Sequence, residues 1–271
     1  MPLFGPSQFT SARETKLSQR RSALERASKA LTAIPEHPKE NLILSTPAQE
    51  LTQKIRDKEW TSLMVVAAFA RRCLATQEDL NCLTEGIAPG ERLNIVMIAE
   101  ALERAKELDE YQEKNGNTIG PLHGVPFTLK DTFNVQGYDS SLGISQFVGK
   151  PYQKSSALYT ALTNLGGVLL AKTNIPQTLL AFECNNPIFG QTHNPCVKGF
   201  TCGGSSGGEG VVLARNATAL GFGTDIGGSL RIPAGWCGIY SLKPTKGRFT
   251  ANGIFSTAEL CNVNESFESR P

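Results

Sequence analysis

Histidine is scarce in this sequence of 271 residues, which contains only His37, His123 and His193. All three precede residue 203, where the most informative segment of the chain begins. In hydrolases with a serine nucleophile elbow, the catalytic histidine follows the serine along the chain. A Ser-His-Asp hydrolase of that kind therefore does not fit, and His123 and His193 are expected to be hydrogen-bonded loop residues.

Excess charge and paired cysteines are also absent. The 27 basic and 25 acidic residues leave a net charge of +2, which predicts no nucleic-acid partner. The seven cysteines are scattered and none belongs to a C-x-x-C pair, so neither a disulfide framework nor a zinc site is expected. We expect no metal and no cofactor, and we expect buried thiols such as Cys202 to be small packing residues in a reducing compartment.

The chain has no long apolar run. Its longest uncharged stretch, residues 155–171, contains serine, threonine, asparagine and two glycines, so it is too short and too polar to cross a membrane. Residues 1–6 provide no apolar core for a signal peptide. A soluble cytoplasmic protein without a transmembrane segment is the resulting expectation.

Hydrophobic spacing predicts a helical first part and a mixed second part. Apolar residues recur at helical intervals through residues 12–114. Beyond Gly116, short apolar runs that suit buried strands alternate with helical segments. The expected strands cover residues 125–129, 168–171, 219–223 and 239–242. This alternation predicts the α/β fold class, with a largely buried sheet within residues 115–249.

Two glycine-rich stretches, residues 203–210 and 223–229, carry the chemistry. Each places a serine directly after a glycine pair, at Ser205 and Ser229. A serine hydroxyl is a poor nucleophile until a base removes its proton. Lys130, which ends an apolar run beside glycine and proline, is the candidate base.

A phosphate cradle is the competing interpretation of the first stretch. Glycine-rich turns at helix N-termini bind anions. A P-loop, however, requires lysine after its last glycine, whereas Gly208 is followed by Glu209. A carboxylate at that position would repel phosphate, so this interpretation is set aside.

Several motifs occur in a fixed order along the chain. They are Gly-Pro-Leu-His-Gly-Val-Pro-Phe-Thr-Leu-Lys-Asp at 120–131, Lys-Thr-Asn-Ile-Pro-Gln at 172–177, the glycine–serine stretches with Leu-Arg-Ile-Pro-Ala at 230–234, and Leu-Lys-Pro-Thr at 242–245. Together they resemble the amidase signature family from about residue 45 to about residue 249. Residues 108–111 and 185–190 are similar to its acetamidase branch, near the fatty acid amide hydrolases. The resemblance implies a mixed central β-sheet covered by helices on both sides, and hydrolysis of carboxylic amides.

The same resemblance assigns roles to individual residues. Lys130 corresponds to the catalytic lysine, Ser205 to the bridging serine that follows a cis peptide bond, and Ser229 to the nucleophile of a Ser-Ser-Lys triad. The backbone N–H groups that would form the oxyanion hole belong to Ile226, Gly227, Gly228 and Ser229. Leu179 corresponds, more distantly, to a substrate-contacting position.

Elementary chemistry is consistent with these roles. Lysine acts as a base only when neutral, and its ordinary pKa of about 10.4 must fall by ~3 units for that to happen near neutral pH. Burial behind apolar strand residues such as Phe127 and Leu129 would lower it. Ser229 would then attack the amide carbonyl, with Ser205 passing protons to and from Lys130, and water would hydrolyse the acyl-enzyme.

Four further residues are expected to have structural roles. Ser206 would cap the helix that begins at residue 207. Asp225 and Arg231 would pair and brace the nucleophile loop. Lys172 is expected at a solvated strand end.

The chain also departs from the family pattern. Residues 88–97 look like an insertion, and residues 250–271 do not resemble the family's continuation and are expected to be irregular. Residues 1–249 would then be the N-terminal portion of one amidase domain, with a sheet incomplete at its C-terminal side. An unpaired strand edge would favour association, so a homo-oligomer is possible besides the small-molecule amide substrate.

Two alternatives to an active amidohydrolase remain open from the sequence. One is an inactive fragment or pseudoenzyme with at most a binding role. The other is a glutamine-amidotransferase-type subunit, which shares the triad but needs partner subunits. Neither the amide nor its acyl length can be inferred from these residues.

Overall fold

The computed structural model describes residues 6–85, 97–255 and 264–268. Its centre is a mixed six-stranded sheet in the order β1-β3-β2-β6-β8-β7, in which β2 runs parallel to β3 and β6 and the other pairs are antiparallel. These strands are β1 Leu83–Glu85, β2 Pro126–Lys130, β3 Val168–Thr173, β6 Leu220–Thr224, β7 Tyr240–Ser241 and β8 Asn264–Glu268. A separate hairpin pairs β4 Asn185–Asn186 with β5 Gly190–Gln191.

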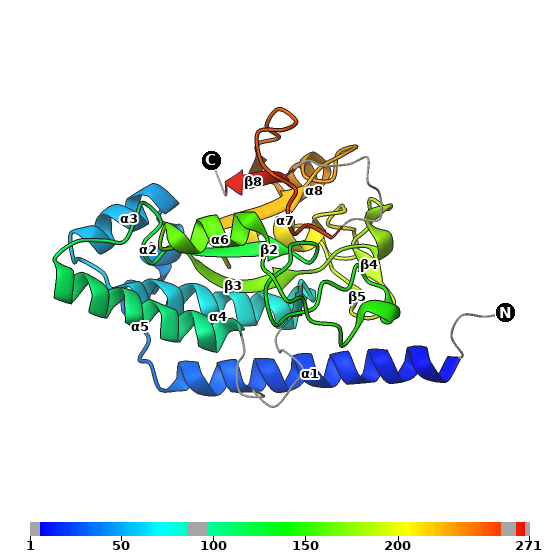
Figure 1. Cartoon of the computed structure of the whole chain (residues 1–271), viewed down its shortest axis with the longest axis horizontal. Helices are drawn as coiled ribbons and strands as arrows, with labels where there is room; N and C mark the ends of the chain where they lie inside the picture. Colours follow the sequence, from blue (N-terminus) through cyan, green and yellow to red (C-terminus); the bar gives the residue numbers. More distant parts are fainter. Residues whose placement is uncertain (1–5, 86–96, 256–263, 269–271) are drawn as a thin grey trace.

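Helices surround this sheet (Figure 1). They are α1 Pro6–Thr32, α2 Glu40–Ser45, α3 Ala48–Arg56, α4 Ser62–Leu80, α5 Met97–Asn115, α6 Ala157–Asn164, α7 Gly207–Ala214 and α8 Arg231–Cys237, with 3₁₀ turns η1 Ser145–Phe147 and η2 Gln177–Leu179. Side chains cap two of the predicted helix starts: Thr61 accepts the N–H of Met64, and Ser156 accepts the N–H of Tyr159. The expectation of alternating strands and helices is confirmed.

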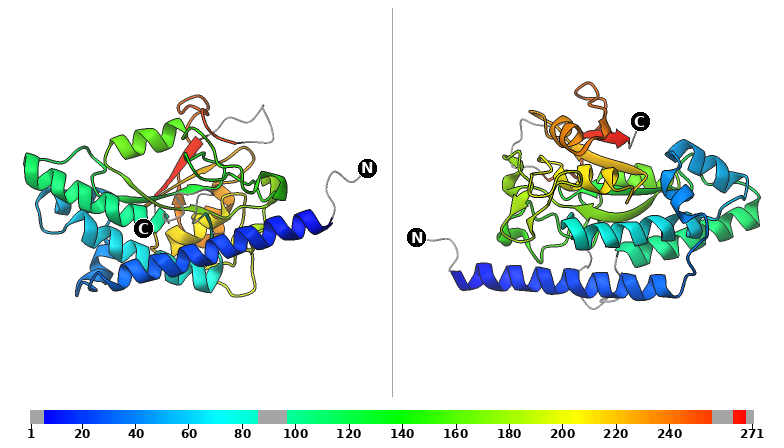
Figure 2. Two further views of the ribbon diagram at one scale, coloured as in Figure 1. Left: turned by 60° about the horizontal axis from the view of Figure 1, so that its bottom comes forward. Right: turned by 180° about the vertical axis from the view of Figure 1, so that it is seen from behind.

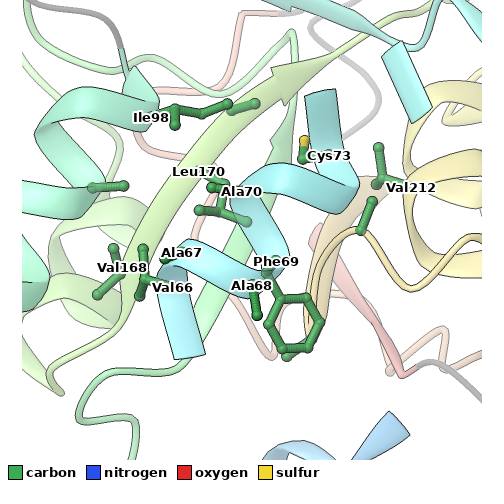
Figure 3. Close-up of a cluster of buried hydrophobic side chains, with 14 of the residues drawn as sticks. Val66, Ala67, Ala68, Phe69, Ala70, Cys73, Ile98, Val168, Leu170 and Val212 are labelled. Carbon is green, nitrogen blue, oxygen red and sulfur yellow. The ribbon is translucent and has the colours of Figure 1, made fainter. Parts of the chain in front are cut away.

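The larger hydrophobic core fills the space between one face of the sheet and α4, α5 and α7 (Figure 3). The apolar face of α4 is built mainly from small residues, including Ala67, Ala70 and Cys73, which allow close approach to the sheet. Val168 and Leu170 of β3 contribute the sheet side of this core. This packing fixes β3 against the helices on that face of the sheet.

A second core lies on the opposite face, under α6. Phe127 and Leu129 of β2 pack there with Leu162 of α6 and Phe222 of β6. Because side chains alternate along a strand, the intervening residues of β2 point to the other face, toward α7. Lys130 is one of those residues.

Helix α1 lies along the outer side of α4 and α5 (Figure 2). A buried ion pair anchors it, because Lys16 Nζ lies 2.7 Å from Asp139 Oδ2 and both side chains are buried. Lys172 Nζ, also fully buried, donates to Ser140 Oγ at 2.8 Å and to the carbonyl oxygen of Asp139. The prediction that Lys172 lies at a solvated strand end is therefore wrong, since polar groups of residues 139–140 accept the hydrogen bonds of its amine inside the protein.

The segment predicted to be an irregular tail contains strand β8. Its residues pair with β6, Leu220 opposite Glu268 and Thr224 opposite Asn264, and on its other side with β7. The prediction of irregularity is wrong for residues 264–268, because backbone pairing with a free strand edge requires no strong side-chain pattern. Of the predicted insertion, residues 88–96 lie outside the described residues.

No helix in the part of the chain that the structure describes has the length and apolar character needed to span a bilayer.

Candidate active site

The predicted catalytic lysine lies at the carboxyl end of the central strand. β2 and β6 are parallel neighbours, so their carboxyl ends meet at one edge of the sheet, where open α/β folds bind ligands. Lys130 is the last residue of β2, and Thr224 is the last residue of β6. Lys130 Nζ donates to Thr224 Oγ1 at 2.8 Å, and a longer contact of 3.4 Å reaches the Thr224 carbonyl oxygen.

Lys130 also contacts the first predicted catalytic serine. Its side chain is 0% exposed, and its Nζ lies 2.7 Å from Ser205 Oγ. Burial lowers the pKa of Lys130 from 10.5 to about 7, although the negative charges of Cys184, Asp225, Glu209 and Asp131 oppose the shift. The amine is therefore substantially neutral near neutral pH, as the sequence argument requires.

The peptide bond between Gly204 and Ser205 is cis, as the resemblance implied. Ser206 follows at the N-cap position of α7, but its side chain does not cap the helix. Instead its Oγ donates to the Thr224 carbonyl oxygen at 3.3 Å and lies 3.4 Å from the Thr224 nitrogen. The capping prediction for Ser206 is wrong, because the end of β6 lies within reach of its hydroxyl.

Glycine at 207 and 208 allows the first turn of α7 to approach its neighbours closely. A Cβ at Gly207 would collide with the side chains of Cys184 and Cys202, and a Cβ at Gly208 with the backbone of Asn174. Cys202 is fully buried there, in agreement with its expected packing role. The turn that carries Ser205 and Ser206 is thereby held against the end of β3.

The loop that carries the second serine is braced by Asp225. The Asp225 carboxylate accepts N–H bonds from Gly228 (2.8 Å) and Leu230 (3.1 Å) and two bonds of 2.9 Å from the Arg231 guanidinium. Burial alone would raise the pKa of Asp225, but these hydrogen bonds outweigh it and hold the pKa well below its ordinary value. The predicted Asp225–Arg231 pair is confirmed.

The loop places Ser229 beside the first serine pair. Ser206 N donates to the Ser229 carbonyl oxygen at 3.0 Å, which ties the two glycine–serine stretches together. Ser229 is half-buried. In the part of the chain that the structure describes, its hydroxyl forms no hydrogen bond to Ser205 Oγ. The three residues thus meet at one site, with the lysine–serine contact already made.

The four expected oxyanion donors are not equivalent. The N–H of Gly228 is occupied by Asp225 Oδ1, which differs from the expectation for this residue. Within the described residues, the N–H groups of Ile226, Gly227 and Ser229 have no hydrogen-bond partner. Ile226 and Gly227 are exposed, so this side of the loop is open to a substrate.

Leu179 is not brought to the triad by any contact in the described residues. It is half-buried at the end of η2, with a φ of +67°. The next residues come nearer, because a Cβ at Gly204 would contact the carbonyl oxygen of Ala181 and the backbone of Phe182. The wall beside Ser205 is therefore formed by residues 181–182.

Sequence reasoning missed two residues of this site. Thr224 binds the lysine amine, and its position at the end of a predicted strand beside Asp225 could have indicated it. Glu209 is fully buried below the lysine strand. A single acidic residue in a helix otherwise built of glycine and aliphatic residues was the available signal.

Comparison with known proteins identifies the family to which the chain belongs. Residues 64–266 match the amidase family, and the chain therefore belongs to that family. The match passes residue 249, where the sequence resemblance was expected to end.

The chain is similar to several curated amidases. Amidase 2 of Gibberella moniliformis is 43% identical over 209 residues, covering 77% of this chain and 39% of that protein. Acetamidase of Emericella nidulans is 39% identical over 224 residues, covering 80% and 39%. Fatty-acid amide hydrolase 1 of Sus scrofa is 35% identical over 213 residues, covering 79% and 34%. The chain thus spans well under half the length of each relative.

Solved structures give the same fold. A fatty acid amide hydrolase superposes with a TM-score of 0.82 and 28% identity, covering 97% of this chain and 48% of that one. A bacterial aryl acylamidase of the amidase signature family superposes with a TM-score of 0.72 and 27% identity, covering 82% and 44%. The predicted α/β fold with a mixed central sheet and surrounding helices is confirmed. Such relatives hydrolyse amide C–N bonds.

Proposed function

We propose that this chain carries the catalytic machinery of an amidohydrolase that cleaves carboxylic amides to an acid and ammonia or an amine. The observation that carries the proposal is the buried Lys130 amine, 2.7 Å from Ser205 Oγ, with a pKa of about 7. A neutral amine has two N–H donors and one lone pair. Thr224 accepts from the donors, which leaves the lone pair for the proton of the Ser205 hydroxyl.

Ser229 is the proposed nucleophile. Its proton passes through Ser205 to Lys130 as its oxygen attacks the amide carbonyl, and a tetrahedral oxyanion forms. For this relay Ser229 Oγ must approach Ser205 Oγ to about 3 Å, a contact that often tightens only when substrate binds. The hydrogen bond from Ser206 N to the Ser229 carbonyl oxygen keeps the two hydroxyls on neighbouring segments.

The free N–H groups of Ile226, Gly227 and Ser229 are the proposed donors to the oxyanion. Each well-placed donor of this kind is worth about 3–4 kcal/mol of transition-state stabilisation. Gly228 has a different role in this proposal, because its N–H holds the Asp225 carboxylate and so fixes the loop.

The second step returns the proton. The Lys130 ammonium, again through Ser205, protonates the leaving nitrogen, and the C–N bond of the tetrahedral intermediate breaks. Water then attacks the acyl-enzyme ester, giving up a proton along the same route, and Ser229 is released with the acid. The names of the relatives, acetamidase and fatty-acid amide hydrolase, support simple carboxylic amides as the substrate class.

A fluorophosphonate probe tests the proposal directly. We expect stoichiometric labelling of the folded chain at Ser229, loss of labelling in Ser229→Ala, and unchanged labelling in Ser45→Ala, which replaces an exposed serine of α2. A folded chain that takes up no label would contradict the proposal and favour the non-catalytic alternative. Hydrolysis of acetamide by the isolated chain would separate an amidase from an amidotransferase subunit.

A further inference from the structure

Two buried thiols meet at the first residue of α7. Cys184 is 1% exposed and Cys202 is 0% exposed, and both are free thiols. A Cβ at Gly207 would lie 3.0 Å from Cys184 Sγ and 2.9 Å from Cys202 Sγ. Both sulfurs are therefore in contact with the same point, and a hydrogen bond joins them. In the reduced chain the two thiols pack against this glycine.

Backbone contacts to Thr192 hold the two cysteines in place. Thr192 N donates to the Cys184 carbonyl oxygen at 2.8 Å, and Cys202 Sγ lies 3.5 Å from the Thr192 carbonyl oxygen. Glu183 and Asn185, on either side of Cys184, are exposed. The pair therefore lies just below the surface, where a molecule of the size of water has to pass only one layer of side chains.

Two further thiols lie near this pair and face backbone carbonyl groups. Cys237 Sγ donates to the Cys202 carbonyl oxygen at 3.3 Å. Cys196, which is exposed, has its Sγ 3.5 Å from the Cys237 carbonyl oxygen. Cys184 and Cys202 are therefore the two thiols best placed to react with each other.

The two thiols also differ in acidity. Burial alone would raise the pKa of Cys184, but hydrogen bonds, of which that from Cys202 is the largest, and the charge of Lys130 lower it. The hydrogen bond to Cys184 and burial raise the pKa of Cys202. Because the thiolate is the reactive form of cysteine, Cys184 is the thiol that reacts first with an oxidant, and Cys202 is the thiol that reacts second.

We propose that Cys184 and Cys202 form an oxidative modification site, at which a peroxide converts the two thiols to a disulfide that slows acyl transfer. The Cys184 sulfur attacks one oxygen of hydrogen peroxide, the O–O bond breaks, and a sulfenic acid and one water form. The Cys202 sulfur then displaces the sulfenic hydroxyl as a second water, and the S–S bond closes. The two sulfurs are oxidised, the peroxide is reduced, and both thiol protons leave in the waters. A thiol reductant reverses the step by exchange.

The disulfide would act on Ser205, which follows Cys202 by three residues. Closing the bond brings the two sulfurs to about 2 Å, so the chain at Cys202 must shift. The glycines between them are closely packed: a Cβ at Gly203 would contact the backbone of Pro233, and a Cβ at Gly204 the carbonyl oxygen of Ala181. The shift therefore reaches the turn that carries Ser205 and alters its 2.7 Å contact with Lys130. This effect, unlike the disulfide itself, rests on the proposed function.

Peptide mapping tests the pairing without any catalysis. Trypsin cleaves after Lys198 and separates residues 173–198, which contain Cys184 and Cys196, from residues 199–215, which contain Cys202. After the folded wild-type chain is treated with hydrogen peroxide and its remaining thiols are alkylated, mass spectrometry should find these two peptides linked. The link should be lost in Cys184→Ser and kept in the matched variant Cys196→Ser. Absence of the link, or a link that persists in Cys184→Ser, would overturn the proposal.

Fragmentation of the linked wild-type peptides covers the case in which a variant does not fold, because the fragment masses distinguish Cys184 from Cys196. A bond assigned to Cys196 would overturn the proposal in the same way.

Fluorophosphonate labelling measures the consequence of the bond. Peroxide treatment should lower the labelling rate of the wild type about tenfold or more, since a displacement of about 1 Å in a catalytic site can cost 10²-fold. Dithiothreitol should restore the rate, and Cys202→Ser should keep its rate through the treatment. Unchanged labelling of a chain in which the disulfide has formed would overturn the proposed effect. A wild-type chain that takes up no label before oxidation counts against the amidohydrolase assignment, whereas an absent disulfide counts against the thiol pair.

Discussion

At the scale of single residues, the burial of Lys130 favours catalysis but lowers the stability of the fold. A base for serine must be neutral, and the protein achieves this by burying the amine completely between β2, β6 and the start of α7. Burial, however, penalises the charged form that the unfolded chain carries. Folding the wild-type chain near neutral pH therefore includes the loss of a proton from a group that would otherwise keep it.

Replacing Lys130 should separate activity from stability. Because the pKa is about 7 in the folded protein and 10.5 ordinarily, the unfolded state binds more protons between these values, and wild-type stability rises with pH across this window. Lys130→Met should raise the free energy of unfolding by up to about 4 kcal/mol at pH 7, at about 1.4 kcal/mol per pKa unit, with the gain shrinking toward pH 10. Urea unfolding at several pH values measures it. Fluorophosphonate labelling should fall by a factor of about 10²–10⁴.

The opposite result would be informative as well. A Lys130→Met chain that is less stable than the wild type at pH 7 would show that the amine's hydrogen bonds to Ser205 and Thr224 outweigh its burial. In the wild type, the labelling rate should rise with pH around 7 as Lys130 loses its proton. A rate independent of pH there would contradict the role of this amine.

Lys130, Ser205 and Ser229 could be predicted from the sequence because they lie in motifs that occur in a fixed order along the chain. The buried surroundings of the neighbouring charged residues could not be predicted in this way. Lys172 has the same local pattern as a lysine at an exposed strand end, and only the 139–140 loop, distant in sequence, makes it buried. Glu209 was used to exclude phosphate binding, but its two threonine partners come from strands about 36 and 81 residues away. Contacts between residues so far apart in the sequence produce no periodic pattern from which they could be predicted.

At the scale of elements, α1 is attached through the buried Lys16–Asp139 ion pair and through an apolar face that joins the larger core. Removing one partner of a buried pair leaves an uncompensated charge, which costs about 3–5 kcal/mol. Exposed pairs such as Lys106–Glu103 on α5 contribute at most about 1 kcal/mol. The two pairs therefore make a matched comparison.

We expect Lys16→Met to lower the free energy of unfolding by several kcal/mol and Lys106→Met to change it by less than about 1 kcal/mol. Urea denaturation followed by circular dichroism measures both. Protease cleavage within residues 6–32 should be faster in Lys16→Met, since α1 is released first. Equal stability of the two variants would show that α1 is held by its apolar face, with Ala23, Ala27 and Leu31, rather than by the ion pair.

Elements that depend on local signals were predicted well. Thr61 and Ser156 begin their helices as expected, because a hydroxyl before an apolar periodic segment is a direct N-terminal signal. Ser206 has the same local context but a different partner, because the end of β6 competes for its hydroxyl. β8 was missed because its pairing comes from the free edge of β6 rather than from its own residues.

At the scale of the whole molecule, large apolar side chains surround the open side of the site. Leu180 is 82% exposed, Phe182 52%, Ile226 53% and Trp236 49%. Trp236 lies against Gly203, and the backbone of Phe182 lies against Gly204. Exposed apolar side chains therefore lie on the segments that adjoin the two glycine–serine stretches, and such side chains can form a binding surface.

We expect the folded chain to bind the dye anilinonaphthalene sulfonate at these side chains. Fluorescence should fall in the double variant Leu180→Ser/Phe182→Ser, because these changes remove apolar area that no core contact uses. Leu42→Ser, at an exposed position of α2, should leave the dye signal unchanged. If the double variant binds as much dye as the wild type, these side chains are covered in solution, and sedimentation would show by what number of copies.

The place of β8 in the sheet bears on how the protein is made. β6 and β7 flank the nucleophile loop and α8, yet they are joined in the sheet only through the strand between them, residues 264–268. In a nascent chain emerging from the ribosome, the outer edge of β6, next to the segment that holds Ser229, therefore stays unpaired until residues 264–268 have left the exit tunnel.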